Sequence, residues 1–244
     1  MFRKKTIKNK SYLVIVAAVI LIAAIVAAIT SSHKKAINQD TNIVNLPNNI
    51  KDAQAQSYTT AKVPIVKDDD KMLGSDEAPL KVFVYEDYTN EFSTKLAETL
   101  DKIKAESGNQ IGIIFRPYIL ENSPFALQAA VAVDCAGEQD KWLEMRALLF
   151  AQAKNQELTA DNFNNYAQQI DLDENKFATC LTNPQKSERI EQSVAEAAGY
   201  GVQGAPAMFI NDEMILGARP YDDFIDSNGD KIQGLKTLIG NRIK

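Results

Sequence analysis

The stretch Leu80-Lys-Val-Phe-Val-Tyr-Glu-Asp-Tyr-Thr-Asn-Glu-Phe-Ser93 decides the fold of this chain. Residues 80–86 are β-rich and partly alternating, and Pro79 precedes them, so they are predicted to form a strand. From residue 90 to residue 107, apolar residues recur at helical spacing, and Gly108 follows. Residues 110–116 are predicted to form a second strand that Pro117 ends. The order strand–helix–strand is typical of a parallel crossover unit.

The rest of the chain predicts a helical block followed by a hairpin. Two pairs, Ser123-Pro124 and Asn183-Pro184, carry the signal of an N-cap followed by proline in the first helical turn. We expect helices at residues 125–153 with a break near Gly137, at 162–170, at 174–181 and from 183 to 199, strands at 207–211 and 214–217, and a terminal helix within 221–244. The predicted class is therefore α/β with a helical insertion.

The composition excludes several kinds of site. The 244 residues include two cysteines and one histidine, with 45% hydrophobic and 24% charged residues, as in an ordinary globular protein. Two thiols cannot form a four-cysteine zinc site or an iron–sulfur cluster. The one histidine, His33, follows directly after an apolar segment, so a histidine-based catalytic centre in the main body is not expected. We expect no metal and no cofactor.

The charge is divided unevenly along the chain. The net charge is −5, but seven of the 27 basic residues lie in residues 1–35, where no acidic residue occurs. The remaining chain carries 20 basic and 32 acidic residues. Binding of nucleic acid requires a basic surface, so no nucleic-acid partner is expected.

The N-terminal region predicts a membrane anchor. Residues 13–29 are an uninterrupted run of 17 apolar residues, and five basic residues precede it. A helix over residues 12–30 would be about 28 Å long, close to the hydrocarbon thickness of a bilayer. The positive-inside rule then predicts a single-pass protein of the cell membrane with residues 1–11 in the cytoplasm and the rest outside. A cleaved signal peptide is the alternative, but its apolar core is shorter and ends at a small-residue site.

Residues 31–73 are predicted to be a flexible tether. Eight of residues 36–60 are Asn or Gln, and all eleven glycines lie at or after Gly74. We therefore expect the folded domain to occupy residues 74–244, with the helical insertion at about 123–200. Residues 68–70, three consecutive aspartates, are expected to form a solvated turn.

Several strings in this order resemble the DsbA-like thioredoxin-fold family of secreted disulfide oxidoreductases. They are Gly74-Ser-Asp-Glu-Ala-Pro79, Phe115-Arg-Pro117, Cys135-Ala-Gly-Glu-Gln-Asp-Lys-Trp142, Phe177-Ala-Thr-Cys-Leu181 and Gly201-Val-Gln-Gly-Ala-Pro-Ala-Met-Phe-Ile-Asn211. The resemblance covers residues 74–244. It implies a thioredoxin-like fold with an inserted helical subdomain, and a cis-proline at Pro206 beside the active site.

The sequence departs from this family at the motif that carries the chemistry. Where the family has Cys-x-x-Cys at the helix start, this chain has Asn90-Glu91-Phe92-Ser93. Thiol–disulfide exchange needs sulfur nucleophiles, so we expect no catalytic residue at Asn90 or Ser93 and no ordinary redox activity. Either side chain can instead cap the helix. Because the related kappa-class glutathione transferases use a serine in this region, thiol binding by Ser93 remains a hypothesis.

The two cysteines and the cis-proline segment complete the candidate residues. Outside the cytoplasm, Cys135 and Cys180 are expected to pair, with two buried free thiols as the alternative, and they match paired cysteines in some family members. The bridge would stabilise the fold by roughly 4 kcal/mol. The resemblance places Ala205 and Pro206 where an extended peptide binds; a turn retained only for folding is the other interpretation.

The predicted function follows from these observations. We expect a membrane-anchored, extracytoplasmic, DsbA-like module that binds extended or unfolded polypeptide or an envelope protein, using Glu91, Phe92, Ala205 and Pro206. The alternatives are an oxidoreductase acting through Cys135 and Cys180, a glutathione-type thiol-binding enzyme acting through Ser93, and a structural member of an envelope complex.

Overall fold

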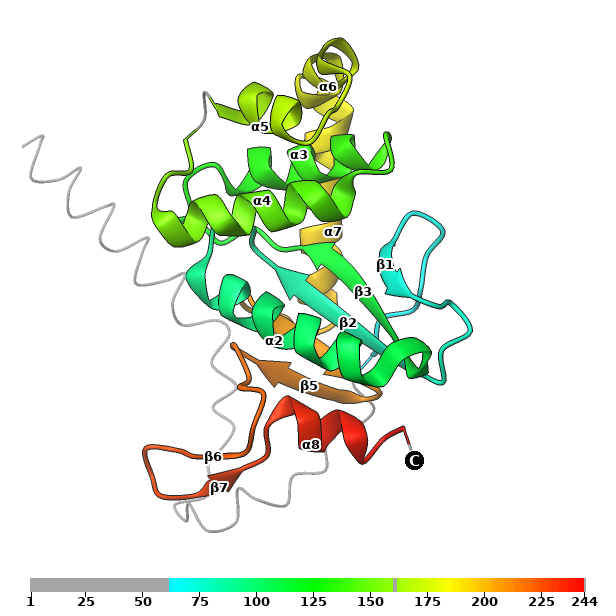
Figure 1. The fold of residues 1–244 in the computed structure, drawn as a ribbon, viewed down its shortest axis with the longest axis vertical. Coiled ribbons are helices and arrows are strands. Elements are labelled where there is room, and N and C mark those ends of the chain that lie inside the picture. Colours follow the sequence, from blue (N-terminus) through cyan, green and yellow to red (C-terminus); the bar gives the residue numbers. More distant parts are fainter. Residues whose placement is uncertain (1–61, 160–161, 244) are drawn as a thin grey trace, which may run out of the picture. The chain divides into compact units, whose positions relative to one another are not determined.

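Strands β2 (Leu80–Glu86) and β3 (Ile111–Pro117) lie parallel at the centre of the fold, connected by helix α2 (Glu91–Ser107) and the 3-10 turn η2 (Gly108–Gln110). This computed structural model describes residues 62–159 and 162–243 (Figure 1). The predicted strand–helix–strand crossover is confirmed, with each boundary within one residue of its expected position.

The two central strands belong to a five-stranded sheet in the order β1-β3-β2-β4-β5. Strand β1 (Lys71–Gly74) pairs antiparallel with β3, and β4 (Ala207–Ile210) pairs antiparallel with both β2 and β5 (Glu213–Leu216). The hairpin of β4 and β5 is the one predicted at residues 207–217. This sheet places the start of α2 and the segment before β4 at neighbouring ends of paired strands.

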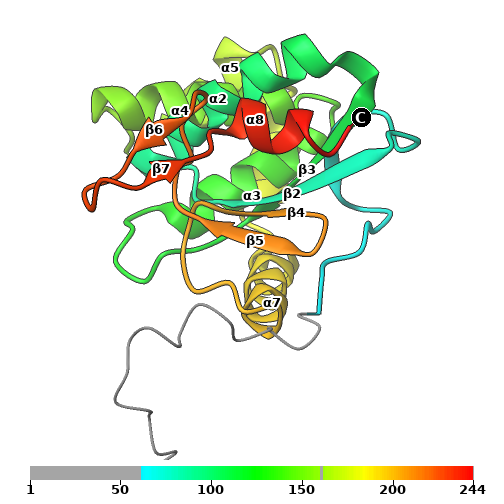
Figure 2. The same cartoon turned by 90° about the horizontal axis from the view of Figure 1, so that it is seen from below.

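Helices cover both faces of the sheet. Helix α2 and the terminal helix α8 (Leu235–Gly240) lie on one face, and α7 (Pro184–Gly199) lies on the other (Figure 2). Successive side chains of a strand point to opposite faces. Accordingly Val82 and Val84 pack with apolar residues of α2 and α8, whereas Phe83 and Tyr85 pack with residues at the end of α7.

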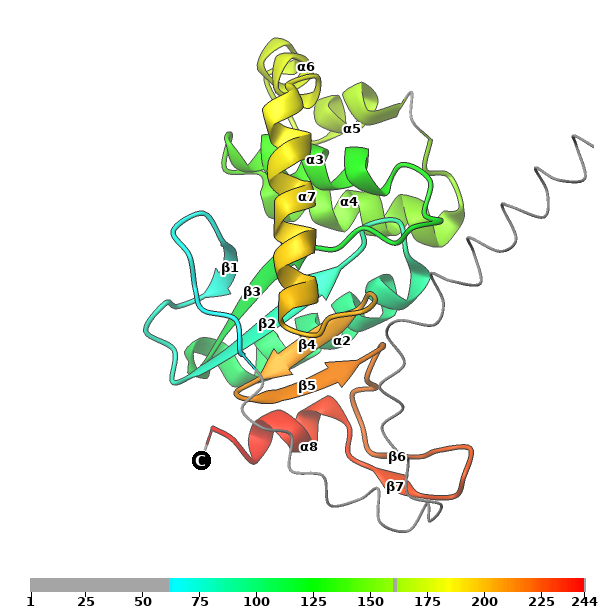
Figure 3. The same ribbon diagram turned by 180° about the vertical axis from the view of Figure 1, so that it is seen from behind.

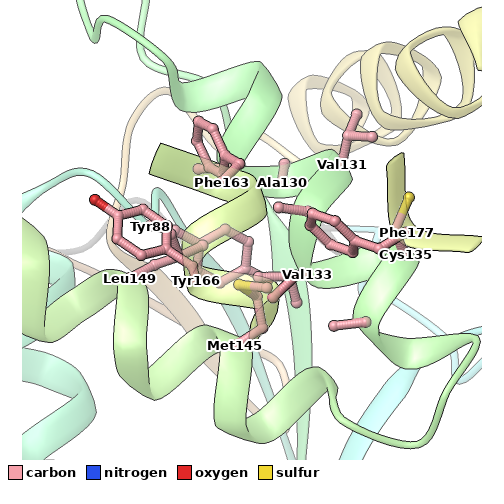
Figure 4. Packing of buried hydrophobic residues seen from close by; sticks show 14 of the residues in the cluster. Tyr88, Ala130, Val131, Val133, Cys135, Met145, Leu149, Phe163, Tyr166 and Phe177 are labelled. Carbon is pink, nitrogen blue, oxygen red and sulfur yellow. The ribbon is translucent and has the colours of Figure 1, made fainter. Parts of the chain in front are cut away.

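The helical insertion lies between β3 and β4. Helices α3 (Ala126–Gly137), α4 (Trp142–Asn155), α5 (Phe163–Gln169) and α6 (Glu174–Leu181) surround a separate apolar core, and α7 leads from it back along the sheet (Figure 3). The core contains Met145, Leu149, Phe163, Tyr166 and Phe177, all nearly inaccessible to solvent (Figure 4). The expected α/β class with inserted helices is confirmed.

One of the two expected proline-associated caps is absent. Helix α7 begins as predicted, because the side chain of Asn183 accepts a hydrogen bond of 3.1 Å from the amide of Gln185. Helix α3, however, begins at Ala126, after Phe125 with a left-handed φ of 65°, and has no side-chain cap. The hydroxyl of Ser123 contacts Thr89 instead of a helix amide, which explains why this prediction is wrong.

The C-terminal region is less helical than expected. A small hairpin of β6 (Phe224–Ile225) and β7 (Lys231–Ile232) precedes α8, which has only six residues. Gly229 turns this hairpin with a φ of 87°, a conformation that favours glycine. At Gly234, a Cβ atom would lie 2.3 Å from the backbone of Asp222, so the chain passes too close for a larger residue.

The folded domain begins before Gly74. Strand β1 starts at Lys71, and the guanidinium of Arg116 on β3 donates to both carboxylate oxygens of Asp70 at 2.8 Å and to the carbonyl of Ile65 at 2.6 Å. The side chain of Asp70 is only 6% exposed. The last part of the predicted tether is therefore packed on the domain, and the expectation that Asp70 belongs to a solvated turn is wrong.

Within residues 62–159 and 162–243, no helix combines the length and apolar character that a membrane crossing requires. Three predictions concern residues that lie wholly or mostly outside the described part of the chain. They are the cytoplasmic segment at residues 1–11, the anchor at residues 12–30 and most of the tether.

Candidate functional site

The side chain of Asn90 caps helix α2. Its Oδ1 accepts hydrogen bonds from the backbone amides of Phe92 at 2.9 Å and Ser93 at 3.0 Å. The first amides of a helix have no partner within the helix, and a side-chain oxygen before them satisfies this need. Asn90 therefore has a structural role at the start of the helix.

Ser93 is fully buried. Its side chain has an exposed fraction of 0%, and its Oγ accepts a hydrogen bond of 3.2 Å from the amide of Asp87. A hydroxyl in this position is not presented to a small thiol in solution. The hypothesis that Ser93 handles a thiol-bearing molecule therefore gains no support from its placement.

Glu91 and Phe92 lie on the exposed first turn of α2. Phe92 is 51% exposed, and the ammonium of Lys95 lies 4.7 Å from the centre of its ring. The same ammonium is 3.6 Å from the carboxylate of Glu91. Lys95 therefore balances the charge of Glu91 and partly covers the aromatic ring.

The peptide bond between Ala205 and Pro206 is cis. Pro206 is buried, and its carbonyl accepts a hydrogen bond of 2.8 Å from the amide of Gly217, the residue after β5. Ala205 is half-buried. This segment leads directly into β4, which pairs with β2, so the cis bond lies next to the strand that ends before Asn90.

A surface hollow of about 500 Å³ joins the start of α2 to the segment before the cis-proline. We call it the Asn90–Gln203 groove, and its lining consists of Asn90, Tyr118, Ile119, Leu120, Glu121, Asn122, Ser123, Pro124 and Gln203. A second hollow, of about 480 Å³, lies on the other side of Asn90 and reaches the end of α4. Phe92, Ala205 and Pro206 line neither hollow, and Glu91 lines the second.

The wall of the Asn90–Gln203 groove is held by Asp87. This residue is 1% exposed, and its carboxylate accepts hydrogen bonds from the amide and hydroxyl of Thr89 at 2.8 and 2.6 Å and from the amide of Leu120 at 3.2 Å. The Thr89 hydroxyl also contacts that of Ser123. Residues 118–124 are thus tied to the turn before α2, which gives the groove a fixed shape.

A buried ion pair lies beneath this turn. The Glu86 carboxylate accepts hydrogen bonds of 2.6 and 2.8 Å from Arg146 on α4, and both side chains are at most 3% exposed. Burial raises the pKa of Glu86, and the charge of Arg146 offsets part of this effect. The guanidinium also lies over the rings of Phe115 and Phe150, 4.2 and 4.9 Å from their centres. The pair connects the sheet to the insertion.

Cys135 and Cys180 form a disulfide between α3 and α6, with the sulfur atoms 1.99 Å apart and 45 residues between them in sequence. Both cysteines lie in the last turn of their helices. The carbonyl ends of helices disfavour negative charge, so these positions do not stabilise a thiolate. Neither cysteine lines the Asn90–Gln203 groove, although Cys180 borders a separate surface hollow with Lys176 and Lys186.

A smaller cavity of about 290 Å³ lies between β3, α3 and α7. Most of its charged lining is already paired, as in Arg116 with Asp70 and Asp134 with Arg189. Asn90 and Ala205 are absent from its lining. This cavity is therefore separate from the candidate site.

The sequence prediction missed the loop that forms most of the groove. The sequence predicts Ser123 and Pro124 only as the start of a helix, and it singles out neither residues 118–122 nor Gln203. The available signal was topological: this loop follows the carboxyl end of a parallel strand, where ligands bind in open α/β sheets. Among the described residues, no group of acidic, histidine or cysteine side chains could hold a metal ion.

Three comparisons place the chain among known proteins. Residues 67–226 match the family model Thioredoxin_4, described as Thioredoxin. The fold resembles the crystal structures of oxidised BdbD from Bacillus subtilis (TM-score 0.60, 16% identity, 72% of this chain and 93% of that chain) and α-DsbA1 from Wolbachia pipientis (TM-score 0.58, 19% identity, 75% and 94%).

A curated relative is the Na⁺/H⁺ antiporter NhaA 3 of Salinispora tropica, which is 30% identical over 161 residues. The alignment covers 66% of this chain and 24% of the relative. The chain therefore spans about a quarter of the length of this relative.

Proposed function

Because the chain belongs to the thioredoxin family, with the DsbA-like character predicted from its sequence, we propose that it is a membrane-anchored, extracytoplasmic module that binds extended polypeptide. The Asn90–Gln203 groove is its binding site, and the disulfide between Cys135 and Cys180 stabilises the insertion. The partner is an unfolded or extended segment of another protein outside the membrane.

One observation carries this proposal: the groove joins the start of α2 to the segment before cis-Pro206, and it is lined by amide, hydroxyl and apolar groups and one carboxylate, with no thiol. The hydrogen bonds of Asp87 hold its wall in one arrangement. A site that is already ordered loses less conformational entropy when a ligand binds. Such a groove suits binding of a flexible chain.

The chemistry at the helix start argues against exchange at this site. A mixed disulfide requires a thiolate, and the side chains at the two family positions are an amide that caps the helix and a buried hydroxyl. The alternative function, exchange at the disulfide, requires an incoming thiolate to attack Cys180 Sγ and release Cys135 as a thiolate. The position of Cys135 at a helix carbonyl end makes it a poor leaving group.

The membrane location rests on the N-terminal sequence. Five basic residues precede the 17 apolar residues 13–29, which is the charge arrangement of a segment inserted with its N-terminus in the cytoplasm. Labelling cysteines introduced at residues 5 and 60 with a membrane-impermeant reagent in intact cells tests this orientation. Labelling at residue 60 alone is expected, and labelling at residue 5 would contradict it.

Peptide titration of the full-length chain in detergent micelles tests the binding function. The variant Gln203→Trp fills the groove, and Lys154→Trp is a matched control because Lys154 is an exposed helical residue that lines the neighbouring hollow. We expect Gln203→Trp to raise the Kd for unfolded peptides at least tenfold and Lys154→Trp to leave it unchanged. Equal effects of both variants, or no binding by the unmodified chain, would overturn the proposal.

Thiol tagging of the same protein tests the alternative function. The proposal expects no turnover of a reduced dithiol peptide. It also expects that the thiol reagent labels neither Cys135 nor Cys180 until the protein is denatured and reduced. Turnover that disappears in a Cys135→Ser variant would assign the exchange activity to the disulfide and overturn the non-catalytic interpretation.

A further inference from the structure

The Asn90–Gln203 groove carries a single ionised side chain. Glu121 is exposed and belongs to the lining, whereas the other polar members are neutral amide, hydroxyl and phenol groups. Glu121 takes part in none of the ion pairs within residues 62–159 and 162–243. Its charge is therefore not balanced by a neighbouring cation in the described part of the chain.

The other carboxylates around Asn90 are already compensated. Glu91 lies 3.6 Å from the ammonium of Lys95, and Glu98 lies 2.6 Å from that of Lys154. The carboxylate of Asp87 is buried and accepts three hydrogen bonds. Glu121 thus differs from them in offering a free negative charge to a ligand in the groove.

The overall charge of the chain has the same sign. After residue 35, 32 acidic residues outweigh 20 basic ones. Over distances up to the Debye length of about 8 Å, and further at low salt, such an excess attracts cations. The local charge at Glu121 and the charge of the whole region therefore favour the same kind of partner.

We infer that the groove accepts a lysine or arginine side chain of the bound polypeptide and that Glu121 sets this preference. This inference rests on the proposed peptide-binding function and adds its specificity. The cationic group would donate to the Glu121 carboxylate, and the neighbouring side-chain oxygens of Asn122 and Ser123 offer further acceptors at the same wall.

A peptide series with the full-length chain tests the inference. The peptides share one extended, uncharged sequence and differ only at a central position, which is Lys, Arg, Gln or Glu. We expect the Lys and Arg peptides to bind about fivefold more tightly than the Gln peptide at low salt, as for an ion pair exposed to solvent, with the Glu peptide weakest. The preference should shrink at 0.3 M salt.

Two isosteric variants test whether the preference for cationic peptides comes from Glu121 itself or from the net charge of the domain. Glu121→Gln should bring the four affinities within twofold of one another, and Glu98→Gln should leave the preference unchanged because Glu98 is paired with Lys154. An undiminished preference in Glu121→Gln, or equal losses in both variants, would overturn the role of Glu121.

The series also distinguishes the inference from the function on which it rests. Binding of all four peptides with one affinity would overturn the charge preference and leave peptide binding standing. Failure of every peptide to bind would overturn both.

Discussion

The Arg146 guanidinium joins the Glu86 carboxylate through two hydrogen bonds, of 2.6 and 2.8 Å, at the boundary between sheet and insertion. Glu86 is the last residue of β2, and Asp87, which holds the groove wall, is the next residue. The ion pair thus connects α4 to the residue that orders the binding site. Removal of one partner would leave a charge buried without compensation.

Arg146→Ala is predicted to lower the free energy of unfolding by about 3–5 kcal/mol, because the Glu86 carboxylate then remains buried without its partner. Urea denaturation followed by circular dichroism measures this change. The control is Lys154→Ala, which removes an exposed ion pair with Glu98 and should cost no more than about 1 kcal/mol. Similar losses in the two variants would contradict the importance assigned to burial.

Asp87→Asn is predicted to loosen the groove. One carboxylate oxygen becomes an amide donor, so the bonds from Thr89 and from the amide of Leu120 cannot all persist. We expect faster hydrogen exchange at Leu120 and weaker peptide binding, with a stability loss of about 1–3 kcal/mol.

Asp173→Asn provides the matched control for this prediction. Asp173 caps α6 by accepting from the amide of Lys176 at 3.1 Å and does not line the groove. Its substitution should leave exchange at Leu120 and peptide affinity unchanged. A change of the same size at Leu120 would mean that the effect of Asp87→Asn is not local.

Acid is predicted to destabilise the contact between α3 and α7 at Asp134. Burial alone would raise the pKa of this carboxyl, but the hydrogen bond from Lys186 and the charges of Arg189 and Lys71 outweigh it, so the pKa is lowered. A lowered folded-state pKa stabilises the fold above the unfolded-state pKa of about 3.9, and this contribution is lost as the pH falls below it.

Thermal unfolding between pH 7 and pH 2 measures this dependence. Asp134→Asn should have a lower Tm than the unmodified chain at pH 7, and the difference should narrow as the pH falls below about 4. A difference in Tm that stays constant from pH 7 to pH 2 would show that ionisation of Asp134 does not contribute to the stability of the fold.

Asn90→Cys combined with Ser93→Cys is predicted to create exchange activity. The two positions lie at the start of α2, where the helix end stabilises a thiolate, and the second position is buried behind the first. Oxidation of a dithiol peptide by the double variant measures the gain. Asn90→Cys alone should form mixed disulfides without turnover, and an inert double variant would contradict the proposed correspondence with the family motif.

The central elements could be predicted because local pattern and tertiary environment agree. Residues 80–86 are rich in β-forming residues and partly alternating, and α2 shows helical spacing and a side-chain cap at Asn90. Strand β1 could not be predicted in this way, because its four residues depend on pairing with β3 and on the ion pair between Asp70 and Arg116. Long-range partners of this kind leave no periodic signal.

The site was predicted less completely than the fold. The helix start and the cis-proline segment follow from motifs, and the structure places them at neighbouring strand ends. The groove itself depends on the loop at residues 118–124, whose shape comes from hydrogen bonds to Asp87 and contact with Thr89. Ser123 shows the difficulty: its sequence context predicts a helix cap, but its hydroxyl contacts a residue 34 positions away.

The disulfide between Cys135 and Cys180 has a consequence for proteolysis. It encloses α4, α5 and the exposed residues at 156–157 between them. A single cut there would leave both fragments covalently joined, and the apolar core of the insertion would still hold them together. The nicked protein would migrate as one species without reductant and as two with it, so the domain can survive a cleaved peptide bond.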